Sequence, residues 1–122
     1  MKLATGIDLV EIMRVEGAIK RHGGQFLERI YTPKELSLFG KSLESLAVRF
    51  AAKEAVVKAL GCGIGAVSWL EIEILRDDMD APVLFLHGKA YQRATLLGYQ
   101  NWSVSLSHTD LHAIALVVVI GE

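Results

Sequence analysis

The chain has 122 residues, of which 52% are hydrophobic, and its 13 basic and 14 acidic residues give a formal net charge of -1. This length predicts a single domain spanning residues 1–122, with enough apolar side chains for a core. The balanced charge excludes a general nucleic-acid binder, which needs a strong basic excess.

The first half of the chain predicts one strand followed by helices. Residues 2–9 are mostly apolar and β-branched, as in a short strand, and residues 11–22 have the apolar spacing of a helix with one buried face. Thr32 is the expected N-cap of the next helix, because Glu35 stands where it closes a capping box. A longer helix is expected at about 44–60.

The second half predicts mainly strands. One strand is expected over 67–75, a second begins at Pro82, and a helix follows at about 88–97. The last two strands, 101–107 and 112–120, are separated by a short polar stretch that suits an antiparallel hairpin. The predicted fold class is therefore α+β, with helices packed on a small antiparallel sheet.

The segment 44–60 mixes charged and large apolar residues around most of its circumference. A surface helix separates the two kinds, so this helix is expected to be buried nearly all round, with its charges paired or serving a ligand. Arg49 and Lys53 repel each other at i,i+4, a penalty that a nearby anion would remove. Glu54 and Lys58 have the spacing of an ordinary helix salt bridge, and that alternative stays open.

Asp8 stands in an apolar strand, where aspartate is rare. It is either the N-cap of the following helix or a carboxylate held at a strand end for a hard cation. Magnesium usually takes one or two protein carboxylates, together with phosphates and water. Asp8 with Glu54 would supply two carboxylates.

The N-terminal segment, residues 1–12, carries two acids and lacks the long apolar run of a signal peptide. The most apolar stretch, 113–120, is too short to span a membrane. Cys62 is the only cysteine, which excludes an internal disulfide and suits a reducing compartment. We therefore expect a cytoplasmic location and no contact with membranes, and the high apolar content favours an oligomer.

Three motifs occur in order along the chain: GIDLVEI at 6–12, RFAAKEAVVKALG at 49–61, and VSLSHT at 104–109. With them the chain resembles the bacterial holo-acyl-carrier-protein synthases, a small trimeric class of 4'-phosphopantetheinyl transferases. The resemblance spans almost the whole chain. It implies the transferase fold, assembly as a homotrimer, and coenzyme A bound in a cleft between adjacent subunits.

The resemblance also implies the roles of individual residues. Asp8, Glu54 and Lys58 would take part in catalysis: the two acids would bind magnesium, and Lys58 would contact the phosphates of coenzyme A. The residues implied in holding coenzyme A are Arg49, Lys58, Gly61, Ser107 and His108. The partner, an acidic acyl carrier protein, would dock on basic residues near the first helix, chiefly Arg14 and Arg21.

The implied reaction is attack by a carrier serine hydroxyl on the β-phosphorus of coenzyme A, as in fatty acid biosynthesis. The expected base is Glu54, acting through water, with His108 as the alternative. Two rival hypotheses remain. One is a magnesium-dependent enzyme for another diphosphate, and the other is an oligomeric binding module whose buried charges are subunit salt bridges.

Overall fold

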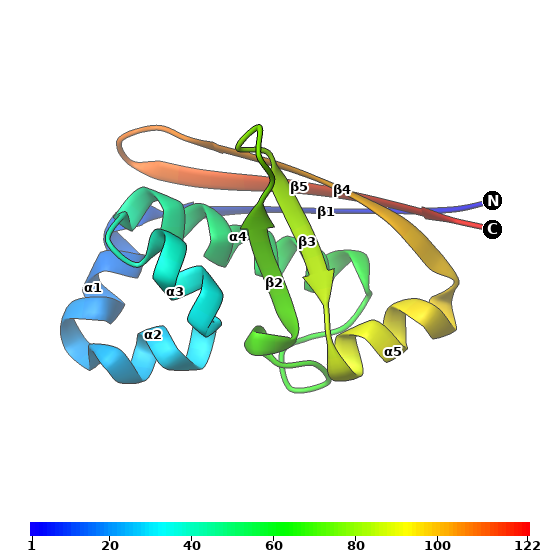
Figure 1. The fold of residues 1–122 in the computed structure, drawn as a ribbon, viewed down its shortest axis with the longest axis horizontal. Coiled ribbons are helices and arrows are strands. Elements are labelled where there is room, and N and C mark those ends of the chain that lie inside the picture. Colours follow the sequence, from blue (N-terminus) through cyan, green and yellow to red (C-terminus); the bar gives the residue numbers. More distant parts are fainter.

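Three long strands form one antiparallel sheet, and every helix lies on the same side of it (Figure 1). The computed structural model describes residues 1–122. The predicted α+β class is confirmed. The elements in chain order are β1 (Lys2–Glu11), α1 (Ile12–His22), α2 (Gly24–Ile30), α3 (Pro33–Phe39), α4 (Leu43–Ala59), η1 (Trp69–Glu71), β2 (Ile72–Arg76), β3 (Pro82–Leu86), α5 (Gly88–Leu97), β4 (Tyr99–His108) and β5 (His112–Gly121).

The strand order of the large sheet is β1-β5-β4, so the first strand of the chain pairs with the last. The predicted hairpin is present as β4 and β5, and β1 adds to it antiparallel with Asp8 opposite Ala115. Alanines and valines of β5 that face α4 are fully buried, and they alternate with more exposed residues. The two faces of this sheet therefore differ, as expected for strands with period-two patterning.

α4 lies across the buried face of the sheet and is its main partner. Eleven of its residues are buried, so the prediction of a helix enclosed nearly all round is confirmed. The small side chains of Ala51, Ala52 and Ala55 are fully buried and let the helix approach the strands closely. At Gly6 of β1 the approach is closest, because a Cβ there would lie 1.8 Å from the carbonyl oxygen of Ala55.

The helices α1, α2 and α3 wrap one end of α4. The predicted cap at Thr32 is confirmed: its side chain accepts a hydrogen bond from the Glu35 amide, and the Glu35 carboxylate accepts one from the Thr32 amide. The helix α2 was not predicted. Its seven residues are too few to establish a periodic pattern.

A second, two-stranded sheet made of β2 and β3 stands apart from the first. The prediction of one strand over 67–75 is wrong in its first part, because Trp69–Glu71 form a 3-10 turn and the strand begins only at Ile72. The Glu71 carboxylate accepts a hydrogen bond from the Ser68 amide, which closes this turn. Alternating polarity is a signal common to an extended segment and a short turn, so the pattern alone did not separate them.

On the face of the large sheet that points away from α4, the part formed by β1 and β5 is largely apolar and uncovered. Ile7 of β1 pairs with Leu116 of β5, and their side chains are 54% and 42% exposed. Leu3, Leu9 and Ile120 share this exposure. No helix of the structure is long and apolar enough to cross a membrane.

Candidate active site at β1 and α4

Asp8, Glu54 and Lys58 meet where β1 crosses α4. Gly6 brings the strand against the helix, and Asp8, two residues further on, points to the same face. Glu54 and Lys58 lie one turn apart on α4 and face the strand. Two segments nearly fifty residues apart in the sequence thus supply one cluster of charges.

The lysine of this cluster is held by β1. Lys58 Nζ lies 3.1 Å from Asp8 Oδ1 and donates a hydrogen bond of 2.8 Å to the carbonyl oxygen of Ile7. The Lys58 side chain is 54% exposed and that of Asp8 is 17% exposed. The ammonium group is therefore fixed in position and still open to solvent on one side.

Glu54 is the electrostatically strained member of the cluster. Burial and, next in size, the Asp8 carboxylate raise the pKa of Glu54 above its usual value, whereas Lys58 lowers it. Two carboxylates that share one lysine leave an excess of negative charge in a partly buried corner. This donor set fits a hard divalent cation such as magnesium, which accepts oxygen ligands and completes its shell with phosphate and water.

Two alternatives from the sequence are wrong. Asp8 is not an N-cap, because it lies inside β1 and the cap position of α1 belongs to Glu11. The ordinary helix salt bridge between Glu54 and Lys58 is not formed, since the lysine turns to Asp8 instead. The structure contains no cluster of three or more His, Cys, Asp or Glu side chains that could hold a metal ion. Asp8 and Glu54 are therefore the two protein ligands available to a cation here.

Lys53 also forms an ion pair, but one that is not part of this cluster. Its ammonium is fully buried, 2.7 Å from Glu35 Oε1, and donates to the carbonyl oxygens of Trp69 and Ile72. Burial lowers the pKa of Lys53, and the Glu35 carboxylate opposes that shift. The anion that would remove the repulsion between Arg49 and Lys53 is thus the carboxylate of Glu35.

Arg49 lies on the other side of α4 from the cluster. It is nine residues from Lys58, which places the two side chains half a turn out of phase on the helix. Its guanidinium donates to the carbonyl oxygen of Ile74 at 3.0 Å and stacks 3.4 Å above the ring centroid of Phe39. Burial lowers the pKa of Arg49 to about 10. With Arg76 it lines a cavity of about 240 Å³.

Ser107 and His108 end the strand β4 and are exposed. β5 separates them from β1, and the strand spacing puts β1 and β4 roughly 10 Å apart. Ser107 stands opposite Ile114 and faces away from α4, unlike Asp8. A single chain therefore does not bring these two residues to the Asp8 cluster.

Gly61 follows Leu60, the C-cap of α4, and has φ of 67°, a conformation that glycine adopts without strain. A Cβ at this position would meet no atom within 4 Å, so the backbone is open to solvent. The carbonyl oxygens of Leu60 and Gly61 accept hydrogen bonds from Arg93 of α5. Sequence reasoning missed Arg93, since no pattern links it to the glycine-rich loop.

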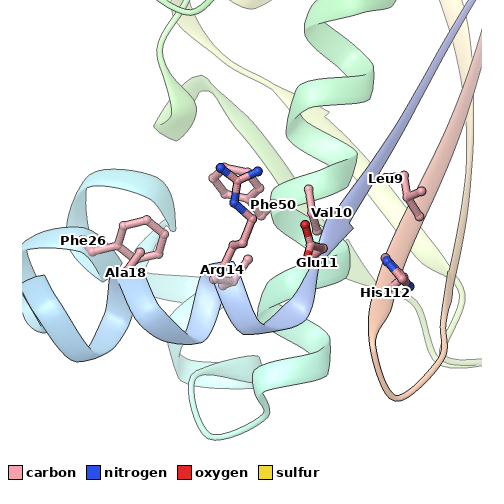
Figure 2. A pocket seen from close by; sticks show the side chains of 9 residues that line it. Leu9, Val10, Glu11, Arg14, Ala18, Phe26, Phe50 and His112 are labelled. Atoms are coloured by element: carbon pink, nitrogen blue, oxygen red, sulfur yellow. The ribbon is translucent and has the colours of Figure 1, made fainter.

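A groove of about 460 Å³ opens beside α1 and the end of β1 (Figure 2). Its floor is apolar, with Phe26 from α2 and Phe50 from α4, and Arg14 of α1 stands over it. Phe50 stacks between Phe26 and Trp69, at centroid distances of 6.4 and 5.1 Å. The basic residues Arg14 and Arg21 are both exposed on α1, so a cationic surface borders an apolar groove.

Residues 4–117 match a family model described as the 4'-phosphopantetheinyl transferase superfamily. The match covers most of the chain, and the chain belongs to this family. Within the family its relatives are holo-[acyl-carrier-protein] synthases. The chain is 48% identical over 126 residues to the holo-[acyl-carrier-protein] synthase from Herpetosiphon aurantiacus, and the alignment covers 98% of this chain and 99% of that protein. It is 50% identical over 116 residues to the one from Dehalococcoides mccartyi strain 195, covering 95% and 97%.

A solved structure supports the same assignment. The holo-[acyl-carrier-protein] synthase of Helicobacter pylori in complex with coenzyme A superposes with a TM-score of 0.87 at 39% identity. The alignment covers 95% of this chain and 99% of that chain. The predicted transferase fold is confirmed.

Proposed function

We propose that this chain transfers the 4'-phosphopantetheine group of coenzyme A to a serine of apo-acyl carrier protein. The products are holo-acyl carrier protein and adenosine 3',5'-bisphosphate, and the reaction serves fatty acid biosynthesis. The observation that carries the proposal is the meeting of Asp8, Glu54 and Lys58 at one partly exposed corner. Transfer from a diphosphate needs positive charge held in place there, because both the substrate and the leaving group are anionic.

Asp8 and Glu54 would hold magnesium, since they offer two oxygen ligands and an excess of negative charge. When bound, the cation supplies positive charge to the diphosphate. Lys58 adds a second positive charge, and its hydrogen bond to the carbonyl oxygen of Ile7 keeps the ammonium beside Asp8. The open backbone at Gly61 leaves room for the phosphates to approach the end of α4.

Glu54 is the group that accepts the proton of the carrier serine, directly or through a water molecule. Because a carboxylate that holds a cation is a weak base, the route through water is favoured. His108 is less suited to the role within one chain, because it lies at the end of β4 on the far side of β5. Placement of the serine in line with the breaking bond accounts for much of the remaining acceleration.

Coenzyme A would bridge two copies of the chain. The Asp8 cluster and the Arg49 cavity lie on opposite sides of α4, and this buried helix separates the two sites within a single copy. Arg49 and Arg76 are suited to the nucleotide end, and Ser107 and His108 are exposed where a neighbouring copy would approach. The uncovered apolar face of the large sheet supports assembly into a homotrimer, because contact with other copies would remove this apolar surface from water.

Acyl carrier protein would dock on α1. Arg14 and Arg21 supply positive charge for an acidic partner, and the groove under Arg14 offers apolar surface beside them. The groove borders β1 just beyond Asp8, so a carrier seated there would have its serine near the cluster. We propose that residues 1–122 act as one domain in the cytoplasm.

The test is incubation of the protein with coenzyme A, magnesium and apo-acyl carrier protein, followed by mass spectrometry of the carrier. We expect a mass gain equal to one phosphopantetheine arm, and no gain on a carrier whose serine is replaced by alanine. An enzyme for another diphosphate would leave the carrier mass unchanged, and that result would overturn the proposal.

A further inference from the structure

The C-terminal end of α4 is electrostatically unfavourable for a diphosphate. A helix carries about half a negative charge at that end, located on its unpaired carbonyl groups. Lys58, which would meet the diphosphate, lies in the last turn. The amides of Gly61 and Cys62 pair with carbonyl oxygens of that turn, but no backbone amide pairs with the carbonyl oxygens of Leu60 and Gly61.

Arg93 of α5 donates to both of these oxygens. Its Nε lies 3.0 Å from the carbonyl oxygen of Leu60, and its Nη2 lies 3.2 Å from that of Gly61. One guanidinium thus spans two successive carbonyl groups, a geometry that its planar fork allows and a lysine ammonium does not reproduce. The half-buried side chain places a full positive charge on the negative end of α4.

The far end of the glycine-rich loop is tied to the same helix. Glu71 accepts hydrogen bonds from the Ser68 amide at 2.7 Å and from the Lys89 amide at the start of α5. Burial opposes ionisation of Glu71, but these amides outweigh it and lower its pKa. Side chains added at Gly63 or Gly65 would touch nothing within 4 Å, so no other element packs on the middle of the loop, which has only its own hydrogen bonds from the Gly65 and Ala66 amides.

We propose that Arg93 is a positioning residue for the diphosphate of coenzyme A. It neutralises the carbonyl end of α4 and fixes the start of the loop at Gly61, without touching the reacting atoms. This inference rests on the proposed function. It makes the binding of coenzyme A, and not the binding of the carrier, depend on a side chain of α5.

The experiment compares Arg93→Met with the wild type and with Lys89→Met, which removes an equal charge from an exposed side chain of α5 and keeps the amide bound by Glu71. We expect the KM for coenzyme A to rise roughly tenfold in Arg93→Met, because two charge-assisted hydrogen bonds are lost. The KM for the carrier and the kcat should stay within about twofold of wild type. Arg93→Lys keeps the charge but not the planar guanidinium, so its KM for coenzyme A should lie between those of the wild type and Arg93→Met.

Calorimetric titration with adenosine 3',5'-bisphosphate gives a second readout, independent of turnover. Weaker binding by Arg93→Met, with Lys89→Met unchanged, would support the role of Arg93. Equal affinities in all variants, or a rise in both KM values with a lower melting temperature, would overturn it. Absence of transfer by the wild type would instead contradict the proposed function. If Arg93→Met does not fold, an unchanged KM for coenzyme A in Arg93→Lys is the contrary result.

Discussion

Lys58 of α4 binds Asp8 of β1 across the strand–helix contact, with 3.1 Å between Nζ and Oδ1. The lysine also donates to the carbonyl oxygen of Ile7, so β1 fixes the ammonium by two acceptors. The contact is possible because Gly6 has no side chain to hold β1 away from Ala55. The positive charge of the site thus depends on a glycine two residues before the aspartate.

Replacing Lys58 by methionine should lower kcat/KM for coenzyme A by about 10²–10³, because a fixed positive charge beside the diphosphate is lost. Lys58→Arg should retain more activity than Lys58→Met, since it keeps the charge. Steady-state kinetics with varied coenzyme A measures both. Activity within twofold of wild type in Lys58→Met would contradict the assigned role.

The variant Glu54→Gln should lose activity and yet be at least as stable as wild type at pH 7. Burial and Asp8 raise the pKa of Glu54, so the ionised form is penalised in the folded state. The penalty is present above the raised pKa and disappears as the pH falls toward the ordinary value of 4.5. Melting temperatures of both proteins from pH 4 to 8, without magnesium, should therefore converge at the acid end.

The matched control is Glu44→Gln, which changes an exposed glutamate in the first turn of the same helix. Its activity should remain at the wild-type level. A stability difference between Glu54→Gln and wild type that grows as the pH is lowered would have the wrong sign for this account.

Lys53→Met should destabilise the fold by about 3–5 kcal/mol, because it leaves the buried Glu35 carboxylate without its cation. Urea denaturation of the assembled protein measures the loss. The contrast with Lys58→Met is the informative part, since Lys58 is half exposed and should change activity far more than stability. Equal stability effects at the two lysines would contradict this separation of roles.

Reversing charge on α1 should weaken carrier binding alone. In the double variant Arg14→Glu and Arg21→Glu, the KM for acyl carrier protein should rise by about tenfold or more, and the KM for coenzyme A should not change. Added salt should reduce the difference in the KM for acyl carrier protein between the double variant and the wild type, because it screens the charges. Lys34→Glu, an exposed change on α3, is the control and should leave both values unaltered.

Leu116→Lys should disrupt assembly, because it places a charge at the centre of the uncovered apolar face. We expect sedimentation to show smaller species and the transfer activity to fall with them. Leu96→Lys changes a leucine that is 86% exposed on α5 and should leave both unchanged. A fully active, monomeric wild type would refute the bridging of two copies.

The local structure could largely be predicted from the sequence. The capping box at Thr32, the buried α4 and the β4–β5 hairpin follow from side-chain chemistry within a few neighbouring residues. The 3-10 turn at 69–71 was missed although Ser68 and Glu71 have the spacing of a capping box, because the alternating polarity over 67–75 favoured a strand. The second hydrogen bond that Glu71 accepts, from the Lys89 amide on α5, has no signal in the sequence.

The candidate site was predictable in composition but not in geometry. Asp8 and Glu54 stood out as acids in apolar segments, and the structure brings them together. The sequence did not indicate that Lys58 would leave Glu54 for Asp8, or that Lys53 would find Glu35. Both outcomes depend on which face of α4 each neighbour covers, which is decided only when strand, helix and second sheet are packed.

The central claim is that Asp8 and Glu54 hold a divalent cation against the diphosphate of coenzyme A. Crystals grown with coenzyme A and manganese in place of magnesium would test it by anomalous scattering. The account predicts one strong peak between the two carboxylates and next to the diphosphate. A peak elsewhere, or coenzyme A bound with its diphosphate remote from Asp8 and Glu54, would contradict it.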